Sequence, residues 1–145
     1  MKVLILCTGN SCRSQMAHGF LQSFDSDINV FSAGTKPVER VNPSAVKVMQ
    51  EEGIDISWHT PHNVEEYLNE SWDYVITVCG GANESCPAFV GKVGHRIHIG
   101  FDDPPKMAKE LADKGASEEE QLECYRKVRD EIKAFVQTLP EALNQ

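Results

Sequence analysis

The chain has 145 residues, of which 41% are hydrophobic and 25% charged, a composition typical of one soluble globular domain covering residues 1–145. Its net charge of -8 argues against nucleic acid as a partner, because a phosphate backbone attracts basic surfaces. No apolar run approaches the length of a membrane span and the N-terminus has no signal-peptide layout, so we expect a cytoplasmic protein without a membrane partner. Nothing in the sequence requires more than a monomer.

Strands and helices are predicted to alternate along the chain. Strands are expected over residues 3–6, 29–34, 73–79 and 96–99. Helices are expected over about 13–24 and 43–52, with a short one over 64–69 and a long one that opens with the capping-box sequence at 117–120. Residues 54–61 and 100–105 are predicted to be loops. The alternation predicts an α/β fold with a parallel sheet of about four strands and helices on both faces.

An anion-binding loop is predicted between the first strand and the first helix. Residues 7–14 have the sequence CTGNSCRS, and the backbone N–H groups of such a loop point inward while the helix N-terminus adds partial positive charge. Gly9 and Asn10 tolerate the unusual dihedral angles that the loop needs. Arg13 can hold two oxygens of a tetrahedral oxyanion at once. The predicted anion-binding residues are Thr8, Gly9, Asn10, Ser11, Cys12, Arg13 and Ser14.

Cys7, which ends the first strand, is the candidate nucleophile of this loop. A free thiol has a pKa of about 8.5, which helix N-termini and neighbouring cations lower to roughly 3.5–7.5. Ser14 could donate a further hydrogen bond to the resulting thiolate. The other interpretation of the pattern C-x5-R-S, core cysteines beside a surface arginine, is less favoured because the pattern lies between a strand and a helix.

The other cysteines indicate thiol chemistry rather than a scaffold. Five cysteines in a chain expected to be cytoplasmic do not indicate structural disulfides, and the absence of a C-x2-C pair argues against a metal site. Cys79 and Cys86 would stand about 10 Å apart in a helix, beyond the ~4.4–6.8 Å of a disulfide, so pairing them requires the segment to rearrange. Gly80, Gly81 and Pro87 favour such a rearrangement. We interpret the segment as a redox switch, with two buried loop cysteines as the alternative.

Asp103 is the candidate general acid. Sites of parallel sheets lie outside the carboxyl ends of the strands, and Cys7, Cys79 and Asp103 all lie at or just after predicted strand ends. A carboxyl group on this loop could protonate the oxygen that leaves an attacked oxyanion. Asp102 is the competing candidate, and either aspartate could instead belong only to a turn or a cap.

These motifs resemble a known family. The pattern C-x5-R-S near the N-terminus is similar to that of the low-molecular-weight protein tyrosine phosphatases. The stretches CTGNSCRSQMA, VCGGANESCP and GFDDPP resemble more closely the thioredoxin-coupled arsenate reductases, which are relatives of these phosphatases. The phosphatases usually carry an aromatic residue beside the acid, whereas prolines follow Asp103. The resemblance covers nearly the whole chain and implies the low-molecular-weight phosphatase-like fold.

The resemblance also implies an activity, the reduction of arsenate to arsenite by three cysteines. In this three-cysteine relay Cys7 attacks arsenic and Cys79 then attacks the sulfur of the Cys7 adduct. Cys86 attacks Cys79 in turn, so that the disulfide ends between Cys79 and Cys86. Thioredoxin is then the reductant and protein partner, no cofactor is tightly bound, and phosphate and sulfate are substrate analogues. Some family members hold a potassium ion with carboxylates at the positions of His18 and His62, so the histidines make that site an open question in this chain.

Two other functions fit the same residues. A phosphotyrosine or phosphomonoester phosphatase would use Cys7, Arg13 and Asp103, with water resolving a phosphocysteine, and would not need Cys79. Arsenate and phosphate are near isosteres, so weak phosphatase activity is expected in either case. A non-enzymatic domain could instead carry a phosphocysteine, or act as a thiol redox sensor that forms its disulfide with peroxide and without arsenate.

Overall fold

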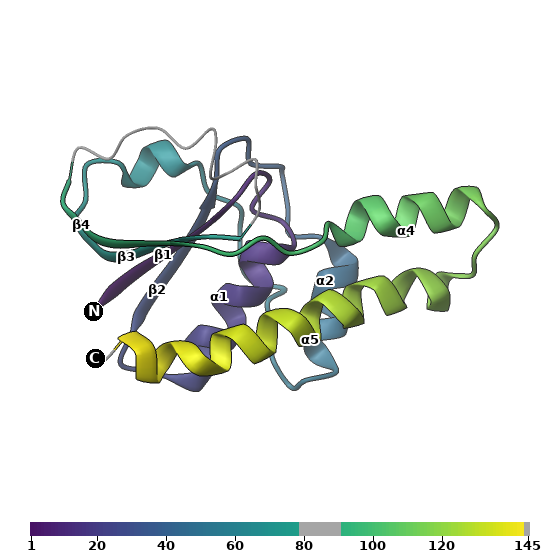
Figure 1. The fold of residues 1–145 in the computed structure, drawn as a ribbon. Helices are drawn as coiled ribbons and strands as arrows, with labels where there is room; N and C mark the ends of the chain where they lie inside the picture. Colours follow the sequence, from purple (N-terminus) through teal and green to yellow (C-terminus); the bar gives the residue numbers. More distant parts are fainter. Residues whose placement is uncertain (79–90, 144–145) are drawn as a thin grey trace.

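The computed structural model describes residues 1–78 and 91–143, which build a four-stranded parallel sheet with helices (Figure 1). The strands, in sheet order, are β2 Asn29–Gly34, β1 Lys2–Cys7, β3 Trp72–Thr77 and β4 Val93–His98. The helices are α1 Arg13–Phe24, α2 Pro43–Gln50, α4 Pro104–Asp113 and α5 Glu118–Leu143, with the short 3-10 helix η1 Val64–Tyr67. The predicted α/β fold with a parallel sheet is confirmed.

Both faces of the sheet are covered. In Figure 1, α1, α2 and α5 lie on one side of the sheet and η1 lies on the other. The residues of β1 that are inaccessible to solvent are Val3, Leu4, Ile5 and Leu6. From α5, the buried residues Val128, Ile132 and Val136 recur every four positions and form one apolar stripe. Because β1 is a central strand, the loop that leaves its C-terminal end lies in the middle of the sheet edge.

One helix was not expected from the sequence. α4 begins at Pro104, inside the segment 100–105 that was predicted to be a loop, so that prediction was wrong for Pro104 and Pro105 and holds for residues 100–103. Proline is favoured at the first position of a helix because its missing N–H would have no partner in the helix anyway. Asp103 is the N-cap residue of α4, although its side chain makes no capping hydrogen bond. The sequence Asp-Pro-Pro was therefore a local start signal for a helix.

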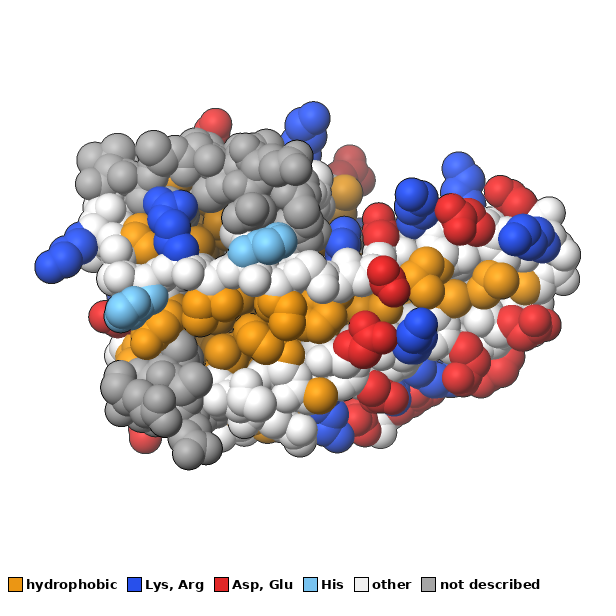
Figure 2. All heavy atoms as spheres, viewed as in Figure 1, with side chains coloured by type: hydrophobic (Ala, Val, Ile, Leu, Met, Phe, Trp, Pro, Cys, Tyr) orange, Lys and Arg blue, Asp and Glu red, His pale blue; other side chains and the backbone are white. Residues whose placement is uncertain are grey.

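The α4–α5 pair extends beyond the sheet (Figure 1). Figure 2 shows charged side chains of both signs over this pair, and a band of hydrophobic side chains along the line where α5 passes beneath the sheet. The loop before α4 contacts α5 through Phe101 and Phe135, whose ring centroids are 6.1 Å apart. Within the described part of the chain, none of the helices combines the length and the apolar character that a membrane crossing needs.

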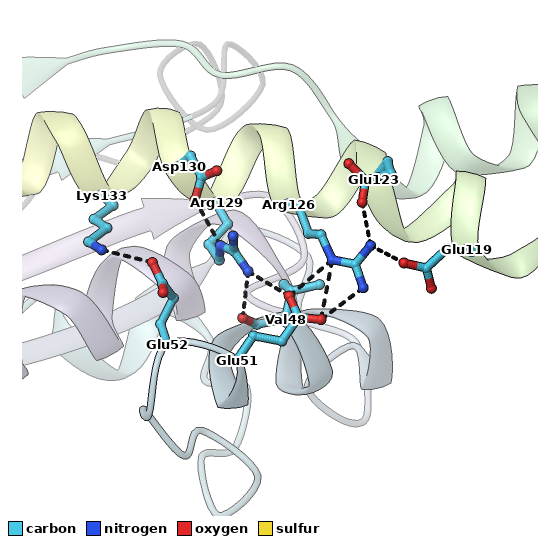
Figure 3. A network of polar contacts seen from close by, with 9 residues as sticks. All are labelled: Val48, Glu51, Glu52, Glu119, Glu123, Arg126, Arg129, Asp130 and Lys133. Carbon is cyan, nitrogen blue, oxygen red and sulfur yellow. Dashed lines mark hydrogen bonds and ion pairs between the residues drawn. The ribbon is translucent and has the colours of Figure 1, made fainter.

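An ion-pair network joins the end of α2 to α5 (Figure 3). Glu51 follows α2 and receives hydrogen bonds from Arg126 Nη2 and from Arg129 Nη1, both at 2.8 Å. Arg129 is buried, and its Nη1 also donates to the backbone carbonyl of Val48 at 3.0 Å. The network therefore fixes the C-terminal end of α2 on α5.

Replacing Arg129 with alanine is expected to lower the free energy of unfolding by about 2 kcal/mol, because the buried Val48 carbonyl loses its donor. Hydrogen bonds from Arg126 and Arg129 lower the pKa of Glu51 to about 2. The contribution of these hydrogen bonds to the stability of the folded protein is therefore present at neutral pH and is lost as the pH falls from about 4.5 to about 2. Denaturant unfolding at neutral and acidic pH measures both effects.

The matched control is Lys133→Ala, which removes an ion pair with Glu52 that is only partly shielded from solvent. This variant is expected to lose less than about 1 kcal/mol. Equal losses in Arg129→Ala and Lys133→Ala would contradict the special role of the buried guanidinium.

Candidate active site

Residues 8–12 form the loop between β1 and α1, and the carbonyl groups of its first four residues point outward. Three of these carbonyl oxygens accept hydrogen bonds from backbone N–H groups that follow β2: Thr8 from Lys36 at 2.9 Å, Gly9 from Val38 at 3.1 Å and Ser11 from Asn42 at 2.8 Å. The carbonyl of Asn10 accepts from Gln15 Nε2 at 3.1 Å. Because the C=O and N–H of a trans peptide point in opposite directions, the N–H groups that follow these carbonyls face the inside of the loop. This is the nest geometry that suits an anion.

Asn10 has the unusual backbone conformation of this loop. Its φ of 51° lies in the left-handed region, which asparagine tolerates better than most residues. The fully buried Asn10 side chain accepts from the His62 N–H at 2.9 Å and donates to Ser14 Oγ at 2.8 Å. The side chains of Asn10 and Ser14 therefore brace the loop from outside the anion cavity.

Gly34 is the point where the neighbouring strand approaches the loop most closely. It pairs with Cys7 in the parallel register of β1 and β2. A Cβ at this position would lie 2.4 Å from the carbonyl oxygen of Thr8 and 3.0 Å from the nitrogen of Asn10. Both contacts are with backbone atoms, so no side chain can rotate away to make room. The loop conformation therefore requires glycine here.

Replacing Gly34 with alanine is expected to displace the loop, lowering kcat/KM for the oxyanion substrate about a hundredfold and stability by about 1–3 kcal/mol. Steady-state kinetics and thermal unfolding measure the two effects. Gly100→Ala is the matched control, because the nearest atom to its added Cβ is a side-chain nitrogen at 4.0 Å. A Gly34→Ala protein with normal kinetics would show that the loop tolerates displacement.

The loop encloses a cavity of about 220 Å³, and the residues that line it are Cys7, Thr8, Gly9, Ser11, Cys12, Arg13, Asp103 and Pro105. Cys7 is the last residue of β1, as predicted, and is 4% exposed. Arg13 Nη1 donates to the carbonyl of Phe101 at 3.0 Å, and its Nη2 lies 3.8 Å from Asp103 Oδ2. The fold thus brings a thiol, a guanidinium and a carboxylate to one cavity.

The two aspartates before α4 differ in their surroundings. Asp103 lines the cavity and its carboxylate is directed at Arg13 rather than at the helix N-terminus. Asp102 is exposed and is not part of the cavity wall. Of the two candidate acids, the geometry favours Asp103.

The cysteines fall into separate environments. Burial raises the pKa of Cys12 to about 12 in spite of the neighbouring Arg13, so this thiol stays protonated and packs in the loop. Cys124 is a buried free cysteine of α5. The strand predicted over 73–79 ends at Thr77, and Cys79 and Cys86 lie outside the described residues.

Two contributors to the site were not expected from the sequence. The Phe101 carbonyl, which holds Arg13, is a backbone group with no sequence signal of its own. Gln15 is 1% exposed among the apolar residues of α1, and it supports the Asn10 carbonyl. A polar residue on the apolar face of a predicted helix was the available signal for Gln15, because buried amides require hydrogen-bond partners.

Sequence comparison defines the family. The family profile described as low molecular weight phosphotyrosine protein phosphatase matches residues 2–145 of this chain. The chain belongs to this family. The arsenate reductase of Halalkalibacterium halodurans is 43% identical over 140 residues, which are 96% of this chain and 94% of that protein. The arsenate reductase of Bacillus subtilis is 41% identical, over 94% of this chain and 95% of that protein.

Solved structures in the family have the same architecture. One, described as an arsenate reductase in the phosphate binding state, matches with a TM-score of 0.77 and 33% identity over 98% of both chains. The thioredoxin-dependent arsenate reductase of Corynebacterium glutamicum matches with a TM-score of 0.67 and 25% identity, over 99% of this chain and 60% of that one. The predicted low-molecular-weight phosphatase-like fold and the resemblance to the arsenate reductases are confirmed.

Proposed function

We propose that this chain is a thioredoxin-coupled arsenate reductase of the cytoplasm. The main support is one cavity that combines Cys7, Arg13 and an anion nest, in a chain 43% identical to a curated arsenate reductase over nearly its whole length. Arsenate is a tetrahedral oxyanion that matches the inward-facing N–H groups and the forked guanidinium. Phosphate and sulfate are expected to compete for the same nest.

In the first proposed step, the Cys7 thiolate attacks the arsenic of arsenate held by the loop N–H groups and Arg13. A sulfur–arsenic bond forms and an arsenic–oxygen bond breaks. Asp103 gives its proton to a hydroxyl group of the arsenate, which departs as water. Its position 3.8 Å from Arg13 Nη2 supports this role, because acid and cation then act on the same oxyanion.

In the second step, Cys79 attacks the sulfur of Cys7. A disulfide forms, the sulfur–arsenic bond breaks, and its electron pair stays on arsenic, which leaves as arsenite. Cys86 then attacks Cys79, which frees Cys7 and moves the disulfide to Cys79–Cys86. The thioredoxin dithiol reduces this pair and is itself oxidised. The roles of Cys79 and Cys86 rest on the sequence resemblance, and the thioredoxin step has further support from a similarly folded protein described as thioredoxin-dependent.

The direct test is arsenate-dependent NADPH consumption in the presence of thioredoxin and thioredoxin reductase. Wild-type protein is expected to turn over, and Cys79→Ser is expected to lose turnover because it lacks the thiol that resolves the Cys7 adduct. Cys86→Ser is expected to complete one turnover and to retain a Cys7–Cys79 disulfide, which mass spectrometry of a non-reducing digest detects. Multiple turnovers by Cys86→Ser would exclude the relay.

A phosphatase is the second candidate, favoured by the family profile and by the relative described in a phosphate binding state. Hydrolysis of an aryl phosphate needs Cys7, Arg13 and Asp103 but not Cys79. If neither wild type nor Cys79→Ser reduces arsenate while both hydrolyse the aryl phosphate equally well, the chain is a phosphatase and its additional cysteines have another role.

A further inference from the structure

A second cavity lies beside the anion-binding loop. Its volume is about 130 Å³, and three histidines are in its wall: His18 from α1, and His59 and His62 from the segment before η1. Gln15 and Ser32 also line it. Among the described residues, none lines both this cavity and that of the candidate nucleophile. The proposed reaction uses none of these five side chains.

Gln15 connects the second cavity to the loop. Its Nε2 donates to the carbonyls of Asn10 at 3.1 Å and of Thr60 at 3.4 Å. These two acceptors fix the orientation of the amide, so Oε1 faces His59 Nδ1 at 2.9 Å. Since Oε1 can only accept, His59 carries a proton on Nδ1. Gln15 is 1% exposed, so losing the His59 N–H would leave Oε1 of Gln15 buried without a hydrogen-bond partner.

Gln15 holds the peptide group between Asn10 and Ser11. Asn10 has a φ of 51° and is fully buried. Its carbonyl points to Gln15, so the N–H of Ser11 in the same peptide points the opposite way, into the nest. The hydrogen bonds from His59 to Gln15 and from Gln15 to Asn10 therefore set the direction of one anion-binding N–H group.

The His18 and His59 imidazoles are neutral at physiological pH. Burial lowers the pKa of His18 to about 3, and burial also lowers the pKa of His59 against the opposing effect of Asp55. The rings of His18 and His59 have centroids 4.7 Å apart. Near the opening, His62 Nδ1 lies 3.6 Å from the exposed carboxylate of Glu66.

A potassium ion does not fit this cavity. Hard cations take oxygen ligands, among which carboxylates supply the balancing charge, and no carboxylate of the described residues is in the cavity wall. Three side-chain oxygens in the wall already have imidazole partners: Gln15 Oε1 with His59, Ser32 Oγ with His18 and Thr60 Oγ1 with His62. These hydrogen bonds occupy the oxygens that a cation would need.

We propose that His59, acting through Gln15, is a positioning residue for the anion-binding loop, and that this chain holds the loop without potassium. The inference rests on the loop being the oxyanion site of the proposed function, but it does not depend on arsenate reduction. It applies equally to phosphate binding, which provides a test that is independent of redox chemistry.

The test compares two substitutions at His59. Asparagine keeps an N–H on the atom bonded to Cγ, where histidine has Nδ1, whereas leucine keeps the bulk and removes the donor. His59→Leu is expected to weaken phosphate binding about tenfold and to raise the KM for arsenate by the same factor. Its kcat is expected to change less than about threefold, because the nest binds the ground state and the transition state equally well. His59→Asn is expected to stay within about twofold of wild type in all three quantities.

His95→Leu on β4 is the control for the loss of a histidine outside the site, since His95 is exposed. Equal phosphate affinity in wild type and His59→Leu would overturn the inference, as would an equal loss in His59→Leu and His59→Asn. If the two variants differ as expected while wild type fails to reduce arsenate, the positioning role stands and the proposed function fails.

Whether the loop is held without a bound potassium ion is tested by thermal unfolding and phosphate titration, in potassium chloride and in choline chloride at equal ionic strength. Wild type is expected to give the same Tm and the same Kd in both salts. The double variant His18→Glu, His62→Asp restores carboxylates to the cavity and is expected to gain a higher Tm in potassium. A potassium-specific rise in the Tm of wild type, or no response of the double variant, would overturn this part.

Discussion

Replacing Cys7 with serine is expected to lower arsenate reduction at least about a thousandfold. A serine oxygen cannot form the disulfide that leaves the electron pair on arsenic, so no arsenite is released. Phosphate binding is expected to stay within a few-fold of wild type, because backbone hydrogen bonds hold the loop. Coupled NADPH oxidation measures the first quantity and calorimetric titration with phosphate measures the second.

Cys124→Ser is the matched control, since Cys124 is also a buried cysteine but belongs to α5 and is not in the cavity wall. It is expected to reduce arsenate within about threefold of wild type. Substantial arsenate reduction by Cys7→Ser would transfer the nucleophilic role to another thiol, and loss of phosphate binding in the same variant would show that Cys7 also shapes the nest.

Replacing Arg13 with lysine is expected to lower kcat/KM for arsenate by about a hundredfold or more. The guanidinium is anchored by one nitrogen to the Phe101 carbonyl and presents another near Asp103. An ammonium group offers one charged point, so it cannot hold the loop before α4 and the oxyanion in the same fixed orientation. Steady-state kinetics, with phosphate titration for binding, measure the loss.

Arg40→Lys, on the exposed surface, is the control for exchanging arginine for lysine. Its kinetics are expected to match those of wild type. An Arg13→Lys protein with nearly normal kcat/KM would mean that charge alone is sufficient, and that the forked contact with the oxyanion contributes little.

The strand, loop and helix at the N-terminus were determined by the sequence alone. An apolar run before Cys7, glycine and asparagine at the bend, and helical spacing of apolar residues after Arg13 are all local signals, which act within a few residues. The helix start at Pro104 was equally local, although residues 100–105 were predicted to be a loop. The parallel α/β architecture followed from the order of the elements.

Tertiary structure decided what the loop contacts. The contact of Asp103 with Arg13, the need for glycine at position 34, and the link from His59 to Gln15 all join residues far apart in the chain. Such contacts depend on strand register and side-chain direction, which neighbouring residues do not encode. The sequence by itself therefore determined the presence of an anion-binding loop with a thiol, and the packing of β2 and of the segment before η1 determined how that loop is held.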